Sequence, residues 1–346
     1  MAYSFWSRVI HRVALASPAV AEVSFDIERA VKKPDAAAAA AGRHVFVTGL
    51  ARAGTTILMR QIYAAGGFRS LTYRDMPFVL APNLWAGLSG GARKDMQAEE
   101  RAHGDRLTVD FDSPEALEEV FWRVASGERY IHADRLTPMQ TDCDIENAFR
   151  EYVALVLMEG PGARYLSKNN NNLLRLGGIA SSFPNAHILI PFREPLQHAH
   201  SLLRQHRNFT AQQNEDPFVK SYMTWLVHHE FGADHRPFVF DGASADAVAT
   251  AREGADGLEY WLRQWVNVYG FLLRTAPENC VFLSYEALCE NTEAVWGGVC
   301  EKLGLPLEAP AETLTASHKQ IDRNVPDVLL REAEAVRDAL LRRASG

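Results

Sequence analysis

The stretch HVFVTGLARAGTT, residues 44–56, carries the signal that decides the fold. Residues 44–48 form an apolar run typical of a short buried strand, and a helix is predicted from 55 to about 65. Between them, Gly49 and Gly54 let the loop turn so that successive backbone N–H groups point inward. The following helix adds its positive end to the same place. This unit predicts a loop that holds a phosphate-like anion.

Strands and helices continue to alternate along the chain. Further buried strands are predicted at 164–167, 187–191 and 280–284, and a helix at 293–303 that ends at Gly304. Other helices are predicted after Pro114, along the apolar face Ile145, Phe149, Val153 and Val156, and after Pro217 with Phe218, Tyr222, Trp225 and His229 on one stripe. This alternation predicts an α/β fold, a P-loop-like three-layer sandwich whose central parallel sheet is flanked by helices. Ligands of such folds bind at the carboxyl ends of the strands.

The ends of the chain differ from its middle. Residues 1–30 place Phe5, Val9 and Val13 at helical spacing with Arg8 and Arg12 on another face, which fits a helix that docks on the core or lies on a membrane surface. Residues 32–42, KKPDAAAAAAG, are interpreted as a tether. We therefore expect an N-terminal extension and tether over 1–42, a catalytic domain over 43–310, and a C-terminal lid segment and helix over 311–346.

Composition excludes several classes of protein. The 346 residues are 47% hydrophobic and 23% charged, as in a globular chain with a large core. A net charge of −7 argues against a nucleic-acid partner, so an anion site must be local. No apolar run is long enough to span a membrane. Four widely spaced cysteines, with no CxxC pair, favour a reducing compartment, and we expect a cytoplasmic protein without a metal site.

A second anion site is predicted near the first. Arg193 stands at the end of the strand that begins at 187, and Ser201 lies two turns into the next helix, so both can donate to one phosphate. The Lys of the nucleotide-triphosphatase motif GxxxxGK[ST] is replaced by Thr55, and no acidic strand end is available for Mg²⁺. Two anion sites on adjacent strands suit a ligand with phosphates at both ends.

These motifs together resemble the sulfotransferase family that uses 3′-phosphoadenosine 5′-phosphosulfate (PAPS). GLARAGTT, residues 49–56, resembles the loop that binds the 5′-phosphosulfate, and Arg193 with Ser201 matches the pair that holds the 3′-phosphate. FLSYEAL (282–288) and CEKLGLP (300–306) are similar to the family's YEDL and FLGLP stretch, in which the Tyr, here Tyr285, lies near the adenine. The resemblance spans residues 43–306 and is closer to bacterial and carbohydrate-type members than to cytosolic aryl sulfotransferases.

The resemblance implies an enzyme that moves a sulfuryl group from PAPS to an acceptor hydroxyl or amine without a metal. The donor-binding residues that it implies are Arg52, Ala53, Gly54, Thr55, Thr56, Arg193, Ser201 and Tyr285. Arg52 occupies the loop position of the family's Lys or Arg and is expected at the leaving-group oxygen, as a fixed cation. Two alternatives stay open: a P-loop kinase with a degenerate loop, and a non-catalytic nucleotide-binding protein.

Lys168 and the asparagines after it raise the question of the catalytic base. In aryl-acceptor members this stretch reads KTH, with the Lys at the transferred group and the His as base; here Lys168 is kept and Asn170 stands where the His would be. An amide cannot take a proton at neutral pH. Carbohydrate-type members use a carboxylate shortly after the first helix, which implies Asp75, with Glu119 and Glu118 in reserve. The same comparison implies a carbohydrate or glycolipid acceptor.

The histidines His228, His229 and His235 invite a metal interpretation. Their spacing is not HExxH, so a hydrogen-bonded pocket or core histidine is favoured over a metal ligand. Residues 208–236 are expected to form a wall on the acceptor side.

Overall fold

The computed structural model describes residues 13–89, 99–100, 108–109, 117–240, 254–310, 319–321 and 324–344. Its main sheet has five strands in the order β2-β5-β1-β6-β7, and every neighbouring pair is parallel. The strands are β1 (Val45–Val47), β2 (Phe68–Arg69), β5 (Arg164–Lys168), β6 (His187–Phe192) and β7 (Cys280–Ser284). A separate antiparallel pair joins β3 (Glu99–Glu100) to β4 (Thr108–Val109). The four strands predicted from sequence are confirmed, with ends that differ by at most one residue, whereas β2 was not predicted.

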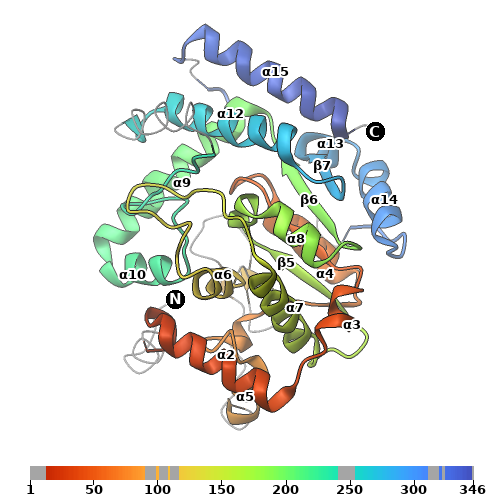
Figure 1. Ribbon diagram of the computed structural model, residues 1–346. Coiled ribbons are helices and arrows are strands. Elements are labelled where there is room, and N and C mark those ends of the chain that lie inside the picture. Colours follow the sequence, from red (N-terminus) through yellow and green to blue (C-terminus); the bar gives the residue numbers. More distant parts are fainter. Residues whose placement is uncertain are drawn as a thin grey trace.

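Helices cover both faces of the sheet (Figure 1). Val45 and Val47 point to the face covered by α4 (Thr55–Ala64) and α14 (Thr292–Leu303). Phe46, between them, points to the opposite face, where α7 (Cys143–Leu157) and α8 (Leu176–Ser182) lie. Alternate side chains of a strand therefore enter two separate cores. The three-layer α/β sandwich is confirmed.

Most other helices belong to the larger core, the one that contains Phe46, or pack beside it. They are α5 (Pro82–Ser89), α6 (Glu119–Ala125), α9 (Pro195–Glu215), α10 (Pro217–Trp225), α12 (Leu258–Thr275) and α15 (Asp327–Ala344), with the short 3-10 helices η1 (Tyr73–Asp75) and η2 (Asn170–Leu174). The short helix α13 (Tyr285–Glu290) follows β7 directly. None of the described helices combines the length and the hydropathy needed to cross a membrane.

The C-terminal helix α15 is part of the core. Leu329, Ala333 and Leu340 are buried against the rest of the protein, and Arg343 donates to the carbonyls of Leu273 and Ala276 at the end of α12. The helix expected within 311–346 is therefore present. Of the lid segment expected before it, residues 311–318 lie outside the described part.

The helix α2 (Pro18–Lys32) docks on the core through a ring and a carboxylate. Phe25 packs edge-on against Phe121 at 5.8 Å between ring centroids. Glu28 is fully buried and accepts hydrogen bonds from the backbone N–H groups of Asn83 and Leu84, in the first turn of α5. The described part of the N-terminal extension thus follows the docking interpretation, whereas residues 1–12 lie outside the described part.

The alanine run is a helix and not a tether, so that interpretation was wrong. Residues Ala36–Ala40 form α3, and the Asp35 carboxylate accepts from the backbone N–H of Ala38 at 2.9 Å. Ala39 is buried and its carbonyl accepts from His44 Nε2 at 2.8 Å. Alanine is the best helix former and aspartate a strong N-cap, so a capped alanine run forms a short helix once it packs on α7.

The carboxyl ends of the parallel strands meet at one edge of the sheet. Thr48 follows β1, Asn169 follows β5, Arg193 follows β6 and Tyr285 follows β7. The glycine loop and the start of α4 lie at the same edge. The motifs singled out in the sequence therefore converge on one place.

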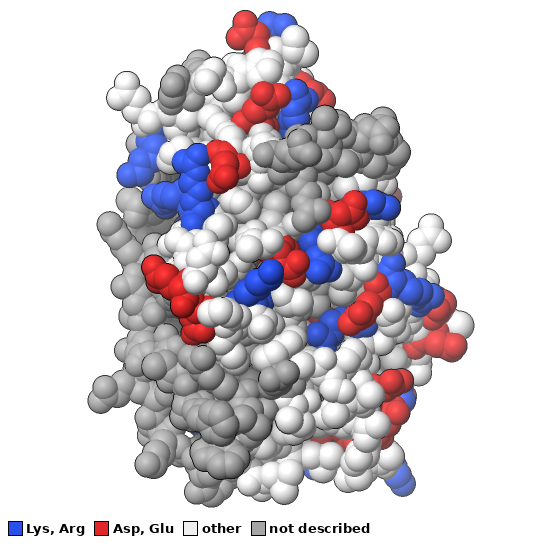
Figure 2. All heavy atoms as spheres, turned by 90° about the vertical axis from the view of Figure 1, so that its left-hand side faces the viewer, with Lys and Arg blue, Asp and Glu red and all other residues white. Residues whose placement is uncertain are grey.

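The surface on the side of α9 and α10 carries charges of both signs. On this face, Lys and Arg side chains lie interspersed with Asp and Glu side chains (Figure 2). Binding of an anion must therefore come from a few converging groups and not from the field of the whole face.

Candidate active site

The loop between β1 and α4 has a backbone that requires glycine at its end. Gly54, just before α4, has φ of 95°, and a Cβ at this position would lie 2.6 Å from a ring carbon of Tyr285. Arg52 also adopts a positive φ, 69°, a strained conformation of the kind found at functional sites. The N-terminus of α4 stands behind the loop. The result is a narrow cradle with the partial positive charge that an anion needs.

Arg193 joins this loop to the strand β6. Its Nη1 donates to the carbonyl of Arg52 at 3.2 Å, and its guanidinium carbon lies 4.9 Å from the centroid of the Tyr285 ring. Its Nε lies 3.9 Å from a Glu286 carboxylate oxygen and is a buried donor without a hydrogen-bond partner among the described residues. A guanidinium with a buried and unused donor is suited to an additional anion.

Ser201 reaches the same loop from α9. Arg52 Nε donates to Ser201 Oγ at 3.4 Å. The structure thus brings together five of the residues predicted to bind the donor, namely Arg52, Gly54, Arg193, Ser201 and Tyr285. Ala53 is buried within the loop, and Thr55 and Thr56 are the first residues of α4.

His198 holds the loop through a hydrogen bond from α9, and the sequence analysis did not single it out. It is fully buried on α9, and its Nε2 donates to the carbonyl of Ala51 at 2.8 Å. Burial, followed by the charge of Arg193, lowers the pKa of His198 to about 3, so the imidazole is neutral at pH 7. Its position one turn before Ser201, on the same face of the helix, is the signal that would have found it.

Lys168 and Asn170 lie on the other side of the loop. Lys168 is the last residue of β5, and Thr48 Oγ1, at the end of β1, donates to the Asn170 carbonyl at 3.3 Å. The Asn170 side chain donates through Nδ2 to Glu230 Oε1 at 2.9 Å. The residue at the expected position of a base is therefore an amide held by a carboxylate from a distant segment.

A family comparison decides the class of this site. A family model described as the sulfotransferase family matches residues 44–309. The chain belongs to the sulfotransferase family. It is an enzyme of the PAPS-dependent sulfotransferase class, which confirms the resemblance noted in the sequence.

Solved structures of bacterial sulfotransferases resemble this sulfotransferase. Sulfotransferase STF1 from Mycobacterium tuberculosis H37Rv matches with 14% identity and a TM-score of 0.48 over 97% of this chain and 85% of that one. Sulfotransferase STF9 from Mycobacterium avium matches with 15% identity and a TM-score of 0.41 over 89% and 70% of the two chains. A sulfotransferase from Alicyclobacillus acidocaldarius matches with 14% identity and a TM-score of 0.37 over 88% and 94%. The comparison with curated proteins gives no match.

Asp75, the leading candidate for the base, has a structural role in this sulfotransferase. Its carboxylate accepts from the Thr72 backbone N–H at 2.7 Å, which completes a capping box around η1. Its other oxygen pairs with Arg69 at 2.8 Å, and only 2% of the side chain is exposed. Both oxygens are therefore engaged, and the carboxylate faces the interior.

Glu119, the reserve candidate, lies in a second internal network. It is paired with the fully buried Arg175 at 2.8 Å and accepts from Asn169 Nδ2 at 2.6 Å and from the Tyr130 hydroxyl. The helix α6 begins at Glu119, later than predicted from Pro114, and residues 114–116 lie outside the described part. The neighbouring Glu118 is engaged in the same way.

Carboxylates and a carbonyl hold the four asparagines after Lys168. Asn169 donates to Glu119, Asn170 to Glu230, Asn171 to the Val227 carbonyl and Asn172 to Glu118. Each of these side-chain amides donates to a fixed acceptor, so together they hold the turn in place. The predicted carboxylates Glu118 and Glu119 therefore position this turn at the edge of the sheet.

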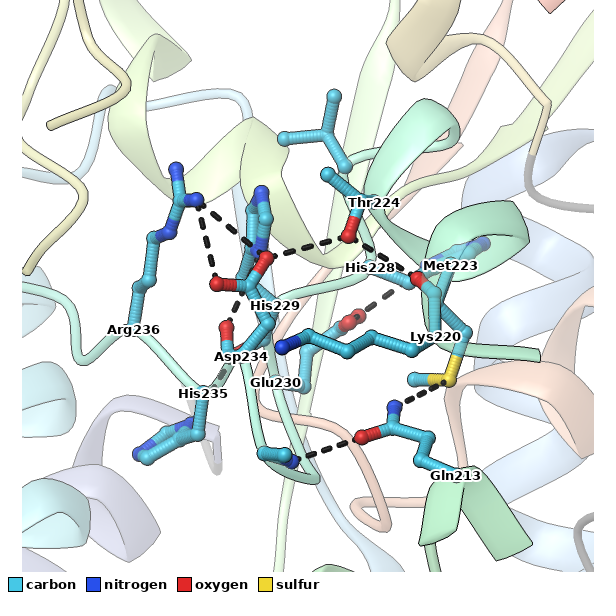
Figure 3. Close-up of polar contacts among 12 residues, drawn as sticks. Gln213, Lys220, Met223, Thr224, His228, His229, Glu230, Asp234, His235 and Arg236 are labelled. Carbon is cyan, nitrogen blue, oxygen red and sulfur yellow. Dashed lines mark hydrogen bonds and ion pairs between the residues drawn. The ribbon is translucent and has the colours of Figure 1, made fainter. Parts of the chain in front are cut away.

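The helix face predicted to run from Phe218 to His229 is shorter than predicted. The helix α10 ends at Trp225, and Val227 takes a positive φ of 56°, so His229 lies in the segment that follows (Figure 3). His229 Nδ1 lies 3.1 Å from an Asp234 carboxylate oxygen, and His235 Nε2 lies 2.6 Å from the Tyr260 hydroxyl. Both histidines are buried and engaged. Among the described residues, no group of three or more His, Cys, Asp and Glu side chains is arranged to hold a metal ion.

Proposed function

We propose that this sulfotransferase binds PAPS between the loop 49–54, Arg193, Ser201 and Tyr285, and transfers its sulfuryl group to an acceptor hydroxyl or amine. The observation that carries the proposal is Arg193, whose guanidinium has a buried and unused Nε and contacts both the Arg52 carbonyl and the Tyr285 ring. Arg193 and Ser201 would hold the 3′-phosphate, and Tyr285 would lie near the adenine. Gly54, which has no side chain, lets the Tyr285 ring pack directly against the loop.

Two cations are available for the transfer itself. Arg52 belongs to the loop that would hold the 5′ end, and a guanidinium keeps its charge at all working pH values, so it stabilises the leaving phosphate oxygen without donating a proton. Lys168, half-buried at the end of β5, would stabilise the charge on the transferring group. When bound, PAPS supplies the activated sulfuryl group; these residues bind and orient it.

We infer a carbohydrate or glycolipid acceptor. Beside the loop, the segment after α10 presents the polar side chains of His228, Glu230 and Arg236, all partly exposed. These side chains can supply hydrogen bonds for a polyhydroxylated acceptor. The departure from a His at Asn170 favours the same choice.

Calorimetry with two ligands tests donor binding. Adenosine 3′,5′-bisphosphate is expected to bind in the presence of EDTA, whereas ATP with Mg²⁺ is expected to bind weakly or not at all. Tight binding of MgATP with no binding of the bisphosphate would overturn the proposal in favour of a kinase.

An acceptor screen tests the transfer. The enzyme is incubated with ³⁵S-labelled PAPS and panels of sugars, glycolipids, phenols and amines, and labelled products are counted. Transfer to sugars or glycolipids is expected. Transfer to phenols alone would refute the acceptor class, and bisphosphate binding without transfer to any acceptor would indicate a non-catalytic binding protein.

A further inference from the structure

A carboxylate that the donor site does not use lies at the edge of the sheet. Glu230, in the irregular segment after α10, has 13% of its side chain exposed. Its Oε1 accepts from Asn170 at 2.9 Å, and its Oε2 lies 3.5 Å from His228 Nδ1 (Figure 3). It also lines a small, mainly apolar cavity together with Leu50 and Ala51 of the loop. Glu230 therefore stands between the phosphosulfate loop and an imidazole.

The surroundings of Glu230 keep it ionised. Burial alone would raise its pKa, but the neighbouring His228 imidazole, the charge of Lys168 and the Asn170 amide together hold the pKa well below its ordinary range. The charged groups that act on this carboxylate thus come from its own segment and from β5. An ionised carboxylate opposite Nδ1 favours the tautomer with the proton on that nitrogen.

That tautomer leaves the other nitrogen able to accept a proton. With Nδ1–H directed at Glu230, the lone pair of His228 is on Nε2, at the opposite edge of the ring. The imidazole has 30% of its surface exposed, so an acceptor can reach it. The neighbouring His229 differs, because it is 2% exposed and its Nδ1 faces Asp234.

We propose that His228 is the general base of the sulfuryl transfer, with Glu230 as its positioning residue. This inference rests on the proposed function. The acceptor oxygen forms a bond to sulfur, the bond from sulfur to the 5′-phosphate oxygen breaks, and the electron pair stays on that phosphate. The acceptor proton goes to His228 Nε2. Imidazole suits this task because it exchanges protons near neutral pH.

Glu230 itself is a poorer base. Both of its oxygens have partners, and its strong preference for the ionised form means that it binds a proton weakly. Asp75 and Glu119 have their oxygens engaged inside the protein. His228 is the most exposed of these four side chains.

The first experiment compares His228→Gln with His187→Gln. His187 is a half-buried histidine at the start of β6, the opposite end of the strand from Arg193, and serves as the matched control. Turnover is measured with ³⁵S-labelled PAPS and the best acceptor of the screen. If no acceptor gives more transfer than water does, turnover is measured instead as release of inorganic sulfate. His228→Gln is expected to lower turnover about 10²–10⁴-fold with unchanged affinity for adenosine 3′,5′-bisphosphate, and His187→Gln to leave both unchanged. Full turnover in folded His228→Gln would overturn the proposal.

The pH profile separates a base from a structural histidine. A general base must be unprotonated to act, so wild-type turnover is expected to fall on the acid side of the pH profile, and this limb is expected to be absent from the residual activity of His228→Gln. A profile of unchanged shape in the variant would overturn the proposal. Failure of the wild type both to bind the bisphosphate and to transfer would instead refute the proposed function.

The positioning role of Glu230 has its own readout. Ring ¹⁵N shifts of His228 are expected to report the Nδ1–H tautomer in the wild type and a loss of that preference in Glu230→Gln, whether or not an acceptor is known. Turnover of Glu230→Gln is expected to fall about 10–100-fold, and Glu230→Asp to recover part of it. An unchanged tautomer in Glu230→Gln would overturn the positioning role, even if the variant is less stable.

Discussion

The guanidinium of Arg193 lies 4.9 Å from the centroid of the Tyr285 ring, and the edge of the same ring closes over Gly54. Three strands of the sheet thereby meet in one contact, because Gly54 follows β1, Arg193 follows β6 and Tyr285 follows β7. A change in any of the three residues is transmitted to the anion cradle.

Arg193→Ala is expected to weaken binding of adenosine 3′,5′-bisphosphate by one to two orders of magnitude, since a charge-assisted hydrogen bond contributes roughly 1.5–3 kcal/mol. Adenosine 5′-phosphosulfate, which lacks the 3′-phosphate, is expected to bind about as well as to the wild type. Calorimetry with both ligands measures the difference. Equal losses for the two ligands would mean that Arg193 acts through its bond to the Arg52 carbonyl and does not contact the 3′-phosphate.

Gly54→Ala is expected to impair donor binding and to destabilise the fold. A non-glycine residue at φ of 95° costs roughly 1–2 kcal/mol, and the added Cβ must displace the Tyr285 ring. Gly177→Ala, in α8 with no atom within 4 Å of the new Cβ, is the control and is expected to be neutral or stabilising. Bisphosphate affinity and urea unfolding are the measurements; wild-type affinity in folded Gly54→Ala would contradict the cradle.

Asp75→Asn separates the capping role from catalysis. Loss of the charge opposite Arg69 and of the cap on Thr72 is expected to lower the free energy of unfolding by about 1–3 kcal/mol. Turnover per folded molecule is expected to stay within a few-fold of the wild type, and Arg69→Gln to show a similar loss of stability. A fall in turnover of 10²-fold or more with unchanged stability would instead make Asp75 the base.

Stability is expected to fall as the pH drops below about 6.5. Burial lowers the pKa of His44 to about 4 and that of His198 to about 3, from an ordinary value of 6.5. Because each folded pKa is lower than the unfolded one, the contribution is complete above pH 6.5 and is lost as the pH falls towards the folded values. For His44 the shift corresponds to about 3 kcal/mol.

Urea unfolding at several pH values between 7.5 and 4.5 measures this dependence. His44→Gln keeps a donor for the Ala39 carbonyl and an acceptor for the Tyr165 N–H, and is expected to flatten the curve. The carboxylate Glu230 affects the pH dependence of the free energy of unfolding only near its ordinary pKa of 4.5 and below. The upper part of the pH range therefore reports on the histidines. A curve of unchanged slope in His44→Gln would contradict the assignment.

Local signals explain why much of the fold was predictable. A run such as 44–48, a glycine pair and a capped helix each act within a few residues, so the strand, the loop and α4 can be recognised without knowing their neighbours. The same holds for Gly304, whose positive φ of 65° ends α14 where the sequence placed the end. The alanine run was misinterpreted because composition cannot say whether α7 lies close enough to pack on it.

By itself, the sequence determined the parallel α/β architecture, the glycine loop between β1 and α4 and the sulfotransferase family, because these depend on short contiguous motifs and their order. The tertiary structure decided which titratable groups are paired in the interior. In the sequence Asp75 and Glu119 are candidate bases, but in the structure they pair with Arg69 and Arg175 in the interior. Glu230 and His228 lie on a segment about 60 residues beyond Asn170, and the fold brings this segment to Asn170. A contact over such a separation leaves no local pattern in the sequence.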